Sequence, residues 1–217
     1  MGVMTRHEID PATLAPGGTY KLINACVVPR AIAWVSSRSA DGVDNLAPHS
    51  YFTVVSVDPP MVAFTSVGWK DSAANIDATG EFVVNMAAGG FEDDINATST
   101  DFPAGISEFD AIGIEREPAL KVAPPRVALS PVALECRKVD ITPIGNCHLV
   151  IGEVLHVAID EATSEPDPVT RRHPRPDAIH PLARLGRNEW AHYGTTFELR
   201  RVPYRKWLEK HDVPGPA

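Results

Sequence analysis

Cysteine is scarce in this chain, and long apolar runs are missing. The only cysteines among the 217 residues are Cys26, Cys136 and Cys147, and no two of them have a C-x-x-C spacing. An odd number of widely spaced cysteines argues against a disulfide framework, so a reducing, cytoplasmic location is expected. No run of about 18 apolar residues occurs and the N-terminus lacks an apolar signal core, so we expect neither a membrane span nor a secretion signal.

Basic charge is also in short supply. The sequence has 20 Lys and Arg residues against 28 Asp and Glu residues, a formal net charge of -8. Nucleic acid is therefore not an expected partner, because binding to its phosphates needs a basic surface. The late arginines nevertheless allow for a small phosphorylated ligand; they are Arg171, Arg172, Arg175, Arg184 and Arg187.

Several catalytic motifs are absent. There is no G-x-S-x-G elbow of a serine hydrolase, and Ser50 follows His49 instead. No G-x-G-x-x-G opens a helix, so a nicotinamide nucleotide would act as a passing substrate and not as a Rossmann-bound cofactor. His148 and His156 share one face of a predicted strand but lie ~26 Å apart, too far to share an ion. The cysteines add no compact ligand spacing, so no metal site is expected.

What the sequence does contain is the pattern of many short strands. Pro 20 and Gly 15 suit tight turns, and 44% hydrophobic residues suffice for a single domain over residues 1–217, with an N-terminal arm (1–19) and a C-terminal tail (203–217). Strands are predicted at 20–28, 31–37, 43–47, 50–57, 61–65, 81–86, 127–136, 139–142, 148–159 and 196–202. Asp41-Gly42 predicts a hairpin, and Gly152 a bulge or a close approach to the backbone.

Helices are predicted to be few and short. They lie at 71–80, 93–98 and 107–111, and residues 160–180 read as a long loop. Successive strands with tight turns and few helices favour a mainly β fold, a closed barrel with short helical insertions.

The stretch from Asn45 to Asn75 holds the strongest local candidates for a site. Lys70-Asp71-Ser72 begins the predicted helix, with Asp71 or Ser72 as the N-cap. Helix N-termini attract phosphate, which Lys70 and the Ser72 hydroxyl would also bind, but an ordinary capped helix explains the same residues. The polar segment 45–50 could present donors and acceptors to a planar heterocycle, or could simply form a turn.

The order and spacing of several motifs resemble the flavin reductase-like family. These are FMN-binding split-barrel proteins that include the reductase components of two-component monooxygenases. The resemblance covers roughly residues 29–202. It rests on PRAIAWVSS (29–37), NLAPHSYF (45–52), DPP (58–60), KDS (70–72), NI (75–76), GEFVVN (80–85), LEC (134–136), GNCH (145–148), GEV (152–154), PLARLG (181–186) and Tyr193.

The resemblance implies a six-stranded antiparallel Greek-key barrel and a homodimer with FMN at the dimer edge. It implies three groups of cofactor-binding residues: Asn45, Leu46, Ala47 and Pro48 along the isoalloxazine; Ser50, Ser66, Lys70, Asp71, Ser72 and Asn75 toward the ribityl chain and phosphate; and Arg30, His148, Arg184 and Tyr193 at the nicotinamide or flavin rim. One departure concerns His148: shorter family members carry Gly-Asp before the histidine, where this chain has Asn146-Cys147.

The implied activity is hydride transfer from NAD(P)H to flavin N5, with FMN, or FAD, supplying the redox chemistry. No general acid or base is assigned. The reduced flavin would serve a partner, for instance a monooxygenase component. Three alternatives stay open: a non-catalytic FMN-binding module, an FMN-dependent oxidoreductase of a small organic substrate, and a barrel with no ligand.

Overall fold

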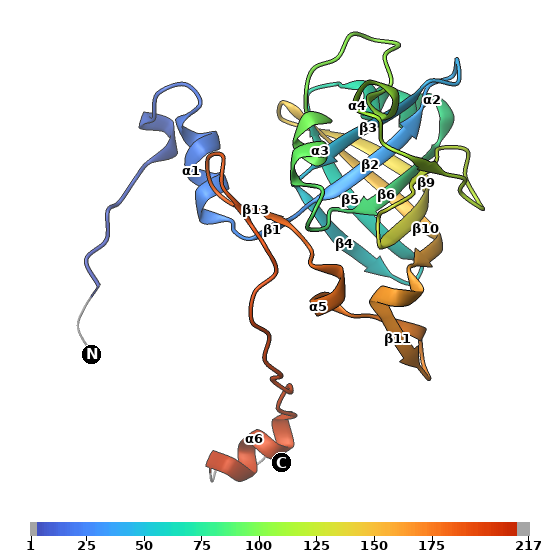
Figure 1. The fold of residues 1–217 in the computed structure, drawn as a ribbon. Helices are drawn as coiled ribbons and strands as arrows, with labels where there is room; N and C mark the ends of the chain where they lie inside the picture. Colours follow the sequence, from blue (N-terminus) through green and yellow to red (C-terminus); the bar gives the residue numbers. More distant parts are fainter. Residues whose placement is uncertain (1–3, 212–217) are drawn as a thin grey trace.

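The computed structural model describes residues 4–211, and their side chains as far as residue 208. Its centre is an antiparallel sheet of seven strands, one more than the six expected, in the order β3-β2-β6-β9-β10-β5-β4. The strands are β2 (Ala33–Arg38), β3 (Asp44–His49), β4 (Phe52–Val57), β5 (Pro60–Val67), β6 (Glu81–Met86), β9 (Val132–Ile144) and β10 (Cys147–Ile159). The sheet curls so that β3 contacts β5 (Figure 1). The mainly β barrel is confirmed.

Local chemistry accounts for the predicted turns. Asp41-Gly42 joins β2 and β3 as predicted, with Gly42 at φ 85°, where a residue with a Cβ is disfavoured. Gly152 lies at a register shift in the β9–β10 pair, and a Cβ there would overlap the Phe82 ring and lie 3.2 Å from the Cβ of Cys136. Both predictions are confirmed.

Two apolar clusters lie on opposite sides of the barrel wall. Val35, Phe64 and Phe82 belong to the cluster inside the barrel, while Trp34 and Leu46 belong to a second cluster with residues of the covering helices. Adjacent strand residues point to opposite faces, and β2 contributes to both clusters through Val35 and Trp34. The barrel wall is therefore fixed from both sides.

Three short helices cover one end of the barrel: α2 (Asp71–Thr79), α3 (Glu92–Ala97) and α4 (Glu108–Ile112). All three were predicted. Gly80 ends α2 in the left-handed conformation, but the predicted cap is wrong, because Lys70 occupies the N-cap position and Asp71 is the first helical residue. No side-chain hydrogen bond caps α2 within the described residues.

The predicted strand at 20–28 is a helix, α1 (Gly18–Cys26), which follows the short 3-10 turn η1 (Pro11–Thr13). Only Thr19 and Ile23 within α1 are β-branched, so the segment has little intrinsic preference for a strand. Arg30 also favours the helix, because its guanidinium donates to the carbonyls of Asn24 and Val27 near the helix end.

The C-terminal third also departs from the prediction. Residues 160–180 are not a plain loop but contain η2 (Glu161–Thr163), a hairpin of β11 (Ser164–Asp167) and β12 (Arg171–Pro174), and α5 (Pro176–Ile179). The predicted strand at 196–202 is wrong: these residues form no strand, and α6 (Tyr204–His211) follows in the predicted tail.

Besides the β11–β12 hairpin, the described residues form two further small sheets. One joins β7 (Arg116–Glu117) to β8 (Arg126–Val127), and the other has the order β1-β13-β14, with β1 (Arg30–Ala31), β13 (Ala183–Arg184) and β14 (Trp190–Ala191). This second sheet, α1 and the C-terminal segment extend away from the barrel and together form a projecting arm (Figure 1). Within residues 4–211, no helix is long and apolar enough to cross a membrane.

Candidate functional site

A cavity of about 340 Å³ lies where β3, β5 and the N-terminus of α2 meet the segment after α3. This volume falls within the range of small-molecule sites. The cavity brings together eight of the fourteen predicted site residues: Asn45, Ala47, Pro48, Ser50, Ser66, Lys70, Asp71 and Ser72. The two halves of the predicted stretch therefore form the walls of one site.

The period of β3 accounts for three of the four residues of this strand that reach the cavity. Asn45, Ala47 and His49 alternate along the strand and share one face, and Pro48, near the end of the strand, lines the cavity as well. Leu46 lies on the opposite face and is completely buried in the second apolar cluster. Its predicted contact with a ligand would have to come through the backbone, and its backbone N–H already has a partner.

That partner is Glu108, a residue that the sequence analysis missed. Its carboxylate accepts a 2.8 Å hydrogen bond from the Leu46 N–H, and its side chain lines the cavity. Burial raises the pKa of Glu108, an effect that the Leu46 hydrogen bond opposes and the charge of Asp71 assists. A carboxyl group that takes up a proton readily thus stands in the cavity wall.

The first turn of α2 presents the features of an anion site. Its opening N–H groups have no partners within the helix, and the positive end of the helix dipole lies there. The Lys70 ammonium is paired with the Asp101 carboxylate at 2.8 Å, and both side chains are exposed. This pair holds the pKa of Asp101 below its usual value. An anion entering the cavity would compete with Asp101 for Lys70.

A hydrogen-bonded chain of side chains joins β3 to α2. Asn45 Nδ2 lies 3.1 Å from Ser72 Oγ, and His49 Nε2 lies 3.3 Å from the same oxygen. Burial lowers the pKa of His49 to about 4; a hydrogen bond with the Thr65 backbone opposes this shift and the charge of Lys70 adds to it. At neutral pH the imidazole is therefore uncharged.

Two further predicted residues serve the frame of the site. The Ser66 hydroxyl, which lines the cavity, donates to the Gly68 carbonyl at 2.9 Å and so shapes the turn into α2. Asn75 lies on the next turn of α2, where its amide donates to the Ser37 hydroxyl at 3.3 Å. The Asn75–Ser37 hydrogen bond holds α2 against β2 of the barrel.

The three predicted rim residues Arg30, Arg184 and Tyr193 lie outside the cavity, on the projecting arm. Arg30 and Arg184 face each other across the β1–β13 pair, and the Arg184 guanidinium stacks on Trp190, 4.7 Å from the ring centroid. Tyr193 follows β14 in an irregular segment. Arg30 approaches the site only indirectly, with its guanidinium 6.0 Å from the ring centroid of Tyr51, a lining residue.

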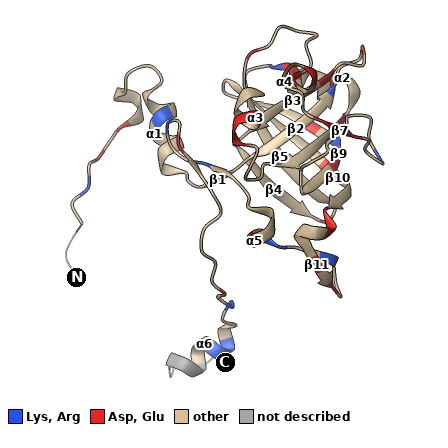
Figure 2. Cartoon of the chain, in the orientation of Figure 1, with Lys and Arg blue, Asp and Glu red and all other residues tan. Residues whose placement is uncertain are grey.

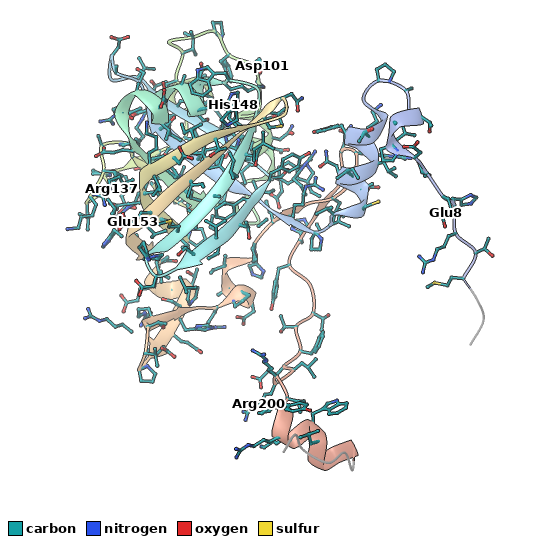
Figure 3. All side chains as sticks on the ribbon, turned by 180° about the vertical axis from the view of Figure 1, so that it is seen from behind. Glu8, Asp101, Arg137, His148, Glu153 and Arg200 are labelled. Carbon is teal, nitrogen blue, oxygen red and sulfur yellow. The ribbon has the colours of Figure 1, made fainter. Side chains whose placement is uncertain are left out.

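His148 lies beside the site on β10, opposite Ser66 of β5. Its ring meets Trp69 edge-on, with 4.9 Å between centroids. Among the described residues, the buried Nδ1 atom has no hydrogen-bond partner. Figure 3 shows Asp101 and His148 at the same end of the barrel, with Arg137 and Glu153 farther along it.

Other lining residues were also missed: Tyr20 of α1, Tyr51, and residues 98–102 after α3. Tyr51 stands next to the predicted stretch 45–50, so an aromatic residue beside that motif was the available signal. Tyr20 and residues 98–102 are separated from the motif by many residues, and only the folded chain brings them to it.

The described residues form neither one large basic face (Figure 2) nor a cluster of metal ligands. Figure 2 shows acidic and basic segments interspersed over the chain rather than gathered into one basic face. Among the described residues there is no group of three or more His, Cys, Asp or Glu residues placed to hold a metal ion. The polar chemistry of the cavity therefore rests on amide, hydroxyl, imidazole and carboxylate groups, Lys70 and the helix N-terminus.

Comparison with known proteins gives one consistent result. A protein of Deinococcus radiodurans is 37% identical over 218 residues, covering 95% of each chain. The crystal structure of nitrilotriacetate monooxygenase component B from Bacillus cereus is 28% identical, with a TM-score of 0.85 over 91% of this chain and 100% of that one. The 2-nitrobenzoate 2-nitroreductase of Pseudomonas fluorescens is 30% identical, with a TM-score of 0.81 over 91% and 96%.

A Shewanella frigidimarina structure described as having a split barrel domain is 20% identical and shares the fold, with a TM-score of 0.80 over 88% of this chain and 96% of that one. The family model of the flavin reductase like domain matches residues 25–176, well over half of the chain. These matches converge on the resemblance that the sequence motifs indicated, and the chain belongs to the flavin reductase-like family.

Proposed function

We propose that this protein is an NAD(P)H-dependent flavin reductase that binds FMN in the cavity between β3, β5 and α2. One observation carries the proposal: a helix N-terminus with Lys70 and the polar face of β3 line the same cavity. The two ends of a phosphorylated heterocycle match these two features: the phosphate suits the helix N-terminus with Lys70, and the ring suits the polar face of β3. FMN is favoured over FAD because a terminal phosphate monoester suits a helix N-terminus.

The residues present fit such a ligand. The N–H groups at the start of α2 and the Lys70 ammonium would hold the phosphate, and the edge of β3 from Asn45 to Pro48 would lie along the ring system. Pro48 has no N–H to donate, and β3 is an end strand of the sheet, so the ring can approach its backbone closely. When bound, the flavin would supply the hydride-accepting chemistry.

The protein's own contribution is orientation. Asn45 and His49 are each hydrogen-bonded to Ser72, so the wall that meets the ligand is fixed before binding. Tyr20 of α1 also lines the cavity. No side chain is needed as a general acid or base.

The arm supports a homodimer. Tyr20, Ile23, Val27 and Val28 of the α1 region are exposed, and Phe197 and Leu199 of the C-terminal segment are more than 80% exposed. Large apolar groups on a projecting arm are typical of an interface. We infer that a second copy covers the arm, and sedimentation at micromolar concentration should give the mass of a dimer.

A second candidate function is reduction of a small organic substrate by bound FMN. The specific support is the 30% identity to a 2-nitrobenzoate 2-nitroreductase. The likeness to a monooxygenase component B supports instead the supply of reduced flavin to a partner oxygenase. Both functions use the same cavity and differ in the acceptor of the electrons.

Steady-state assays separate these candidates. NADH or NADPH oxidation should require FMN, FAD or riboflavin and should saturate with free flavin if the protein is a reductase. Saturation by a nitroarene at a fixed stoichiometry of FMN would favour the second candidate. Tight FMN binding without oxidation of either nicotinamide would identify a non-catalytic module, and no flavin binding at all would refute the proposal.

A further inference from the structure

The Ser72 hydroxyl lies at the centre of the polar wall of the cavity. Ser72 is 2% exposed and Asn45 is 7% exposed, so neither can depend on bulk water for its hydrogen bonds. Asn45 Nδ2 is 3.1 Å and His49 Nε2 is 3.3 Å from Ser72 Oγ. Both partners come from one face of β3, whereas Ser72 comes from α2.

The direction of each hydrogen bond follows from the groups involved. An amide nitrogen only donates, so Ser72 Oγ accepts from Asn45. A neutral imidazole carries one hydrogen and one lone pair. Ser72 is almost fully buried and its oxygen already accepts from Asn45, so the hydroxyl hydrogen needs an acceptor, and His49 Nε2 lies within hydrogen-bond distance at 3.3 Å. The lone pair therefore belongs to Nε2, and Nε2 accepts the Ser72 proton.

This arrangement uses the only hydrogen of the Ser72 hydroxyl. A hydroxyl has one donor and two lone pairs, and one lone pair is already taken by Asn45. Toward the cavity, the Ser72 oxygen therefore has one lone pair left, which can accept a hydrogen bond. From the sequence, the Ser72 hydroxyl is expected to bind phosphate as a donor, and the family resemblance places Ser72 toward the ribityl chain and phosphate. Phosphate oxygens are acceptors at neutral pH, however, and gain nothing from a second acceptor.

We propose that His49 is a positioning residue that draws the proton of Ser72 away from the cavity, so that Ser72 receives a hydrogen bond from a ligand hydroxyl. This inference rests on the proposed function, and the hydroxyl is one belonging to the polyol chain of the flavin. The phosphate is then held by Lys70 and the backbone N–H groups of the first turn of α2, without the Ser72 side chain. Ser72 thereby selects a flavin that carries its sugar-alcohol chain.

Three flavins distinguish contacts with the ring, with the polyol chain and with the phosphate. Lumiflavin has the ring only, riboflavin adds the polyol chain, and FMN adds the phosphate. Ser72→Ala should weaken riboflavin and FMN by the same factor, about fivefold, and leave lumiflavin unchanged, because one neutral hydrogen bond is lost. Lys70→Ala, the matched control, should weaken FMN alone. If Ser72→Ala lowered the affinity for FMN alone, Ser72 would contact the phosphate. If it lowered the affinity for all three flavins equally, Ser72 would contact the ring. Either result overturns the proposal.

The role of His49 is tested by a double-mutant cycle. His49→Phe keeps a ring against Phe64, from which the imidazole is 4.5 Å away between centroids, but removes the acceptor. For riboflavin the double variant with Ser72→Ala should be no weaker than Ser72→Ala alone, since both changes disturb the same hydrogen bond. Additive losses would show that His49 acts independently of Ser72.

A measurement without flavin keeps the inference separable from the proposed function. The ¹⁵N resonances of His49 at pH 6 should show a neutral ring with the proton on Nδ1, and Ser72→Ala should shift the Nε2 resonance. A proton on Nε2, or a charged ring at that pH, would overturn the inference even if flavin binds. Conversely, absence of binding by all three flavins would refute the proposed function and the polyol contact, while the ¹⁵N spectrum would still decide the direction of the hydrogen bond.

Discussion

The carboxylate of Glu108 accepts a 2.8 Å hydrogen bond from the backbone N–H of Leu46, across 62 positions of sequence. The bond ties the first turn of α4 to β3 at the cavity wall. It also places an ionisable group, only 5% exposed, against the strand that is expected to meet the flavin ring. The pKa of this carboxyl is raised by burial, so its charge weakens the folded state.

Glu108→Gln should therefore change stability in a pH-dependent way. A raised folded pKa means that wild-type stability falls as pH rises from about 4.5 through the folded pKa. Glutamine keeps an acceptor for Leu46 and carries no charge. The free energy of unfolding of the variant relative to wild type should be higher at pH 8 than at pH 4, as measured by denaturant titration. The exposed Glu115→Gln serves as control, and an equal difference at both pH values would contradict the burial argument.

The lowered pKa of His49 predicts that the free energy of unfolding changes with pH in the opposite direction, over an overlapping pH range. Its folded pKa of about 4 lies below its ordinary 6.5, so the unfolded chain binds more protons between these values and stability rises with pH across them. The rise amounts to at most about 3 kcal/mol. His49→Phe should remove this part of the pH dependence. An unchanged slope between pH 4 and 6.5 in the variant would mean that His49 titrates normally.

Asp101 is expected to limit anion binding by occupying Lys70. Asp101→Asn frees the ammonium, so FMN affinity should rise about threefold at low salt, while riboflavin affinity stays unchanged. Both affinities can be read from the quenching of flavin fluorescence. If the variant bound both flavins more tightly by the same factor, Asp101 would be acting on the ring or the polyol chain and not on Lys70.

Gly152 tests the packing of the barrel independently of any ligand. A Cβ at this position would overlap the Phe82 ring inside the core. Gly152→Ala should destabilise the protein by about 1–3 kcal/mol through overpacking. Combined with Phe82→Leu, it should cost less than the sum of the two single changes, because the leucine leaves room. Strict additivity would show that the two positions do not compete for the same space.

The sequence predicted the elements that depend on interactions between residues close together along the chain, and it missed those that depend on distant residues. The residues of β3 from Asn45 to Pro48 and the start of α2 at Lys70 were readable because hairpin and helix-start chemistry is local. The helix at 18–26 was missed because the contact of Arg30 with its last carbonyls lies outside the segment. The strand predicted at 196–202 has a suitable pattern, but a strand forms only where a partner edge is available.

The candidate site shows the same contrast between local and long-range interactions. The contact of Glu108 with Leu46 and the closing segment at 98–102 could not be predicted, since both depend on how the helices after β6 fold back over the barrel. The role of His49 was hidden for a different reason. A histidine beside a motif carries no sign of its protonation, which is set by burial against Phe64 and by Ser72 of another element.

The most direct test of the account is anaerobic reduction of flavin by nicotinamide. Wild-type protein mixed with FMN and NADH or NADPH should bleach the flavin absorbance in a stopped-flow experiment. The Lys70→Ala Ser72→Ala variant should need a higher FMN concentration for the same rate, with its fold in the absence of flavin checked by circular dichroism. Failure of wild type to bleach FMN with either nicotinamide, or an unaltered FMN dependence in the variant, would contradict the account.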